Sequence, residues 1–114
     1  MSEITDKLLT YPAAIKVAEE AVWDLIEVYE LAHADVKEQD AGFAVIVNAN
    51  PALKNQGQRD TEIKAMREAS AEYTDALIEE ETAAKNLAIA RINLNFVQNM
   101  FQAYLAIVGG QKEC

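Results

Sequence analysis

Apolar residues recur along both halves of this 114-residue chain at alternating spacings of three and four. In the first half, twelve of the thirteen positions from Ile4 to Ile46 carry an apolar or aromatic residue, with Gln39 as the exception. In the second half, from Met66 to Val108, only Glu80 interrupts the pattern. A spacing of this kind, sustained over many turns, is the repeat of a coiled coil. It predicts two long helices and no strand.

The two 3-4 repeats also match each other when the chain folds back about residue 56. Paired positions then have numbers that sum to 112, and many pairs bring a large residue against a small one, as interdigitated packing requires. The match predicts one long antiparallel two-helix hairpin. The expected pairs are Ile15 with Val97, Ala18 with Leu94, Val22 with Ala90, Leu25 with Leu87, Tyr29 with Ala83, Val36 with Ala76, and Phe43 with Ala69.

We therefore expect a single all-α domain over residues 1–114. Its first helix should run from about 12 to 47, its tip segment from 48 to 60, and its second helix from about 61 to 108. A short helix over residues 3–10, capped by Ser2, should precede the first helix, because Pro12 breaks a helix interior.

The tip segment holds several residues that favour turns and helix ends. Asn50 can cap a short turn that has Pro51 at its first position, and Gly57 can supply a positive φ where one is needed. Asp60 or Thr61 is the predicted cap of the second helix, and the predicted end of that helix is Gly109-Gly110. The first interpretation of this segment is a polar hairpin tip, and the alternative is a tip that contacts a partner.

A second apolar set lies away from these repeats, and a lone two-helix hairpin is too small to bury it. We expect it to be covered by self-association into a symmetric dimer or tetramer, an oligomeric helical bundle. The alternative is a surface reserved for a different protein. On the second helix the set comprises Ile89, Ile92, Phe96, Met100, Ala103 and Ile107, named here the C-terminal apolar face; on the first helix it comprises Ala14, Val17, Ala21, Trp23, Val28 and Leu31.

The chain is acidic, with a formal net charge of -9. This charge disfavours direct binding to nucleic acid and favours solubility; it also allows a carboxylate surface that imitates DNA. Four basic residues do gather at and after the tip, where they could contact an anionic partner: Lys54, Arg59, Lys64 and Arg67. The only cysteine is Cys114, no basic n-region precedes an apolar stretch, and no stretch is long enough to span a membrane. These features predict a cytoplasmic protein.

Polar residues in or beside the repeats are the candidates for chemistry. Glu80 is expected to contact His33 as a polar layer that fixes register, and Gln39 is expected to face the Tyr73 hydroxyl. Glu30 and His33 form an E-x-x-H pair, half of the ligand set of ferritin-like di-iron bundles, so a metal site with Glu80 is a weak alternative. No other catalytic constellation occurs. We expect neither an enzyme nor a bound cofactor.

The stretches NANPALKNQGQRDTEIKA and AKNLAIARINLNFVQNMFQA carry a resemblance. With them, residues 15–105 resemble a loosely defined set of small bacteriophage and prophage helical-hairpin proteins, often encoded near recombination and single-strand-binding genes. The resemblance implies an accessory role in a phage-infected bacterial cell, either in DNA replication and recombination or against a host system, and it carries over no catalytic residue.

The leading expectation is a non-enzymatic oligomeric helical protein that acts through protein-protein contacts. The first alternative is a phage inhibitor of a host defence or nuclease system, acting by acidic mimicry or by ligand sequestration. The second is the carboxylate and histidine metal-binding bundle.

Overall fold

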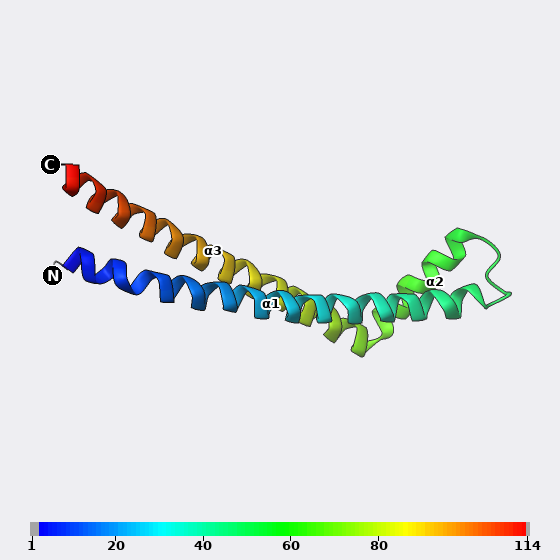
Figure 1. The fold of residues 1–114 in the computed structure, drawn as a ribbon. Helices are drawn as coiled ribbons and strands as arrows, with labels where there is room; N and C mark the ends of the chain where they lie inside the picture. The colour runs from blue at the N-terminus through cyan, green and yellow to red at the C-terminus, as the bar shows by residue number, and fades with distance from the viewer. Residues whose placement is uncertain (1–2, 114) are drawn as a thin grey trace. The chain divides into compact units, whose positions relative to one another are not determined.

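The computed structural model describes the backbone of residues 3–113 and the side chains of residues 3 and 5–110, and all of this backbone is helical except residues 49–55 and Ser70. Helix α1 spans Glu3–Asn48, α2 spans Gln56–Ala69 and α3 spans Ala71–Glu113 (Figure 1). No strand occurs in residues 3–113. The predicted all-α class is therefore confirmed, whereas the calls on Ser2 and Cys114 lie outside the described residues.

The chain divides into two compact units, and each takes part of both long helices. Unit 1 comprises Met1–Glu27 and Lys85–Cys114, and unit 2 comprises Val28–Ala84. Helix α2 lies wholly within unit 2.

Burial follows the two 3-4 repeats. In the second repeat every position except Ala69 is buried or half-buried, and in the first repeat the same holds for every position from Leu8 to Phe43. Ile46 is the exception in the first repeat: it is exposed, and its neighbour Val47 is buried with 1% of its surface accessible. An α-helix has 3.6 residues per turn, so after several 3.5-residue repeats the inward position moves to the next residue. The side chain of Ile4 lies outside the described residues.

Side chains of α1 contact side chains of α3 inside each unit. In unit 1 the Tyr11 ring lies 6.1 Å from the Phe101 ring and 5.6 Å from the Tyr104 ring, measured between centroids. In unit 2, Val36 and Ala76 share a buried cluster with Tyr73. Phe43 packs against this cluster, with its ring edge-on to Tyr73 at 5.5 Å.

The predicted helix break at Pro12 is wrong, because α1 runs without interruption from Glu3. A proline inside a helix removes one backbone hydrogen bond and crowds the preceding turn. Core-facing residues on both sides of it, Leu8, Tyr11 and Ile15, are half-buried, while Pro12 itself is exposed. The burial of these residues before and after Pro12 stabilises the continuous helix and offsets the cost of the proline.

The second helical segment starts earlier than predicted, at Gln56 instead of residue 61. Asn55 is the N-cap: its backbone is extended, and its Oδ1 accepts a 2.8 Å hydrogen bond from the Gln58 amide. Gln58 reaches back, and its Oε1 accepts a 2.7 Å bond from the Lys54 amide. This reciprocal pair satisfies two amides at the helix start. Neither Gly57 nor any other glycine among the described residues has a positive φ.

Ser70 interrupts the predicted continuous helix over residues 61–108. Its backbone is extended and its amide donates to the carbonyl of Arg67, so Ser70 ends α2. Its Oγ accepts a 3.0 Å bond from the Tyr73 amide, so it also caps α3. The predicted end at Gly109-Gly110 is wrong as well, since α3 continues to Glu113. Glycine disfavours a helix by about 1 kcal/mol but does not forbid it.

Candidate functional site

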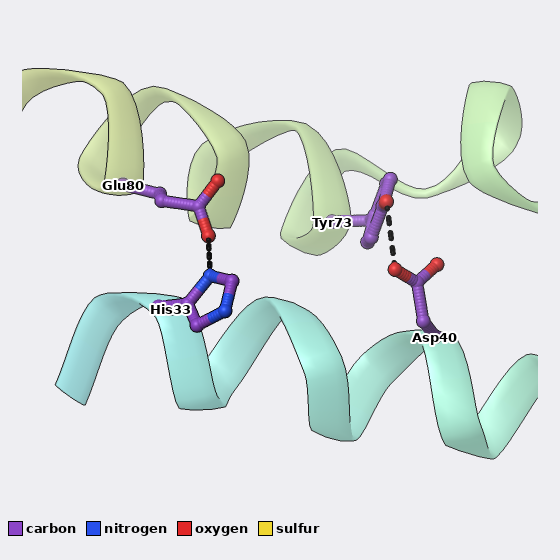
Figure 2. Close-up of polar contacts among 4 residues, drawn as sticks. All are labelled: His33, Asp40, Tyr73 and Glu80. Carbon is purple, nitrogen blue, oxygen red and sulfur yellow. Dashed lines mark hydrogen bonds and ion pairs between the residues drawn. The ribbon is translucent and has the colours of Figure 1, made fainter. Parts of the chain in front are cut away.

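A histidine–carboxylate pair lies between α1 and α3 in unit 2. The Nδ1 atom of His33 is 2.7 Å from Oε2 of Glu80 (Figure 2). A carboxylate can only accept, so a proton on Nδ1 makes the histidine the donor. The His33 ring stacks on Tyr29 at 5.8 Å between centroids. The predicted contact between His33 and Glu80 is confirmed, and it places a polar pair among largely apolar core-facing positions.

Glu30, the third candidate metal ligand, does not form a metal-binding cluster with His33 and Glu80. Glu30 is exposed on α1, and among the described residues no group of three His, Cys, Asp or Glu side chains could hold a metal ion. The pair of His33 and Glu80 alone offers two ligands, fewer than a structural metal site uses. Its geometry fits a layer that fixes the register of the two helices.

A second polar cluster forms where α2 meets α3. Asp40 of α1 accepts a 2.7 Å bond from Arg67 Nε through Oδ1 and a 3.2 Å bond from the Tyr73 hydroxyl through Oδ2 (Figure 2 shows the bond to Tyr73). Arg67 belongs to α2 and Tyr73 to α3, so one carboxylate binds both sides of the Ser70 break. We name Asp40, Arg67 and Tyr73 the Asp40 cluster.

The sequence pattern missed the Asp40 cluster. It placed Gln39 opposite Tyr73, but Gln39 donates to Asp35 on its own helix at 3.3 Å. The residue of α1 that contacts Tyr73 is Asp40, four residues after Val36. The alternating repeat instead places this position three residues after Val36, at Gln39. The one-residue drift that buries Val47 in place of Ile46 has the same direction.

Tyr73 is expected to ionise late in an alkaline titration. Its burial raises the pKa of its phenol above the ordinary value of 10.0, the hydrogen bond to Asp40 and the charge of Asp40 raise it further, and Arg67 partly opposes them. Folding therefore favours the protonated phenol, so this stabilisation is complete below pH 10 and is lost as the pH rises through the pKa of the folded state. Absorbance of tyrosinate should show a late component that Tyr73→Phe removes and Tyr29→Phe leaves in place. A late component that survives Tyr73→Phe would contradict the assignment.

The four basic residues predicted near the tip do not form one free patch. Arg67 is bound to Asp40, and Arg59 is half-buried and donates to the carbonyl of Leu53 at 3.4 Å. Lys54 and Lys64 are exposed. Contact of this region with an anionic partner stays a prediction that depends mainly on these two lysines.

The second apolar set predicted from the sequence is exposed on the chain. On α3, Ile92 and Phe96 have 70% and 61% of their surface accessible, and Ile89 and Ile107 are also exposed, whereas Met100 is half-buried. The off-repeat residues of α1 are exposed too: Ala14, Val17, Ala21, Trp23, Val28 and Leu31. Among the described residues, these exposed side chains are not covered by another part of the chain.

Comparison of the chain with protein-family models, with curated proteins and with solved structures gives no significant match. Among the described residues, no helix has the length and apolar character needed to cross a membrane. The features of the chain that bear on function are therefore the pair of His33 and Glu80, the Asp40 cluster and the exposed apolar surface.

Proposed function

We propose that this chain is a non-enzymatic, oligomeric helical protein that acts through protein-protein contacts. The observation that carries this proposal is the exposure of large apolar side chains on α3, led by Ile92 and Phe96. A monomeric protein rarely leaves such residues clustered in water, and clusters of this kind mark contacts with other chains.

The proposal includes a single antiparallel hairpin formed by α1 and α3. Contacts inside the two units support it, because their residue numbers have nearly constant sums. Lys7 Nζ lies 3.5 Å from the Tyr104 hydroxyl in unit 1, and Tyr11 packs near Phe101. In unit 2 the pair of His33 and Glu80 has nearly the same sum. A hairpin of two helices buries one side of each helix and leaves the others available for a partner.

An accessory role in a phage-infected bacterial cell belongs to the same proposal. It depends on the resemblance of residues 15–105 to phage helical-hairpin proteins. A chain with a formal net charge of -9 is better suited to contacts with proteins than with phosphate backbones.

Light scattering of the purified protein tests the proposal. We expect a mass of two or four times that of the 12.6 kDa chain. The circular dichroism spectrum should remain helical when the protein is diluted to concentrations at which the oligomer dissociates. A mass of one chain at every concentration would contradict self-association, and the apolar surface would then need a different protein as its cover.

A further inference from the structure

We propose that the C-terminal apolar face binds the same face of a second copy, with the two α3 helices antiparallel and centred near residue 98. This inference deepens the proposed function, on which it rests, by naming the surface, the partner and the register.

The chain's own α1 does not cover this face. At 100° per residue, the face lies about 120° around α3 from the core-facing positions such as Leu94 and Phe101. Those positions are half-buried in unit 1, while Ile92 and Phe96 are exposed. Two apolar sides separated in this way let one helix pack against two neighbours at once.

The charge pattern of α3 favours a second copy of this acidic chain. The chain has 19 Asp and Glu residues, yet none lies between Glu81 and Glu113. Two copies can therefore approach through this segment without bringing carboxylates together, although each has a formal net charge of -9. Interface centres are typically depleted of charge and enriched in aromatic residues and Met, and Phe96 and Met100 lie in the middle of the face.

The spacing between residues of the face is nearly the same in both directions along α3, as an antiparallel pair with two-fold symmetry requires. When a residue of one copy is paired with the residue of the second copy whose number brings the sum to 195 or 196, both residues belong to the face. Ile89 then meets Ile107 of the second copy, Ile92 meets Ala103, and Phe96 meets Met100. Two of these pairs, Ile92 with Ala103 and Phe96 with Met100, set a large residue against a small or flexible one, and the thioether of methionine packs well on an aromatic ring. The third pair joins two isoleucines.

The first helix of a second copy fits this face less well. Its corresponding off-repeat positions, Ala14, Val17 and Ala21, are small and could oppose Ile89 to Phe96. Continuing towards the N-terminus, the same spacing reaches Thr10 and Lys7, which are polar. Met100 and Ile107 would then lack apolar partners, whereas the α3–α3 pair covers the whole face.

The accessible surface leaves room for such an interface. The chain exposes 8140 Å². A compact monomer of its mass exposes roughly 6,200 Å², about 1,900 Å² less. A standard interface buries about 800 Å² on each partner. An interface of that size is small against the surface that the chain exposes.

Cross-linking between two different cysteine variants tests the register. In a Cys114→Ser background, Ile89→Cys and Ile107→Cys proteins are prepared separately, mixed, and treated with a short bis-maleimide. We expect a covalent dimer in the mixture and little in either protein alone, because like positions in the antiparallel pair lie about 27 Å apart. Dimer formed by Ile89→Cys alone, or by Ile89→Cys with Ala21→Cys but not with Ile107→Cys, would overturn the proposal.

Two substitutions measure the strength of this contact by light scattering. Phe96→Ser should weaken self-association at least about tenfold, as removal of a central aromatic anchor does. Val45→Ser is the matched control: Val45 is 69% exposed but belongs to neither part of the second apolar set, so the dissociation constant should change less than about twofold. Helical circular dichroism confirms that both variants fold. A multimeric mass without the Ile89–Ile107 cross-link would refute only this register, whereas a single-chain mass for the parent protein would refute the proposed self-association too.

Discussion

Replacing Ala83 with aspartate should destabilise the protein by roughly 3 kcal/mol, since it places a carboxylate in the buried repeat without a partner. Ala83 has 4% of its surface accessible and belongs to the core-facing positions of α3 in unit 2. Domains of this size have only about 5–15 kcal/mol of stability, and a helical hairpin is expected near the lower end. Urea denaturation followed by circular dichroism should show a clear fall in the midpoint.

Ala84→Asp provides the control one residue away. Ala84 is exposed, and both substitutions share the same loss of helix propensity, about 0.7 kcal/mol. Ala84→Asp should therefore cost no more than about 1 kcal/mol. Equal losses in the two variants would mean that Ala83 is not packed against α1, and the repeat would not be the core.

Core positions such as Ala83 could be predicted from sequence because the 3-4 repeat reports burial directly. Core-facing residues such as Val36 and Ala76 belong to one cluster of the same chain, so the pattern of one helix constrains the other. The contact of His33 with Glu80 was predicted because a charged residue inside the repeat needs a polar neighbour, and the matched numbering pairs Glu80 with Ala32, next to His33.

Helix ends were harder to predict because local and tertiary terms compete there. Pro12 signals a break, but half-buried residues on both sides keep α1 continuous. Ser70 gives a weaker signal, yet it ends α2 and caps α3. These local preferences are worth about 1–3 kcal/mol each, similar to the burial that opposes them. A single sequence does not show which one is larger.

The Asp40 cluster was missed because small changes in helical phase accumulate. A strict alternation of three and four places Gln39 inward, whereas the α-helix advances slightly less than this repeat requires. After several turns, Asp40 contacts Arg67 and Tyr73 in its place. The partner of the C-terminal apolar face is harder to predict for a different reason. Exposed apolar residues indicate a contact surface but do not identify the protein that binds it.

Asp40→Ala should cost about 2 kcal/mol and should loosen α2 more than α3. The ion pair with Arg67 is partly exposed and contributes little on its own, about 0.5 kcal/mol. Most of the loss comes from the hydroxyl of Tyr73, which has 7% of its surface accessible and would lose its acceptor. Hydrogen exchange should accelerate over Gln56–Ala69, because the cluster binds this helix to α1 beside the Ser70 break.

Asp35→Ala is the matched control for Asp40→Ala, because Asp35 also lies on α1 but accepts only a 3.3 Å bond from Gln39. Its cost should stay below about 0.5 kcal/mol, apart from the small gain in helix propensity that both alanines share. The double variant Asp40→Ala/Tyr73→Phe should be more stable than the sum of the single changes predicts, since removing the hydroxyl removes the unpaired donor. If Asp40→Ala and Asp35→Ala have equal effects, or if the double variant is strictly additive, Asp40 does not hold the two helices at the break. A non-additive result confined to Asp40 and Tyr73 would instead assign the stability of this junction to their hydrogen bond.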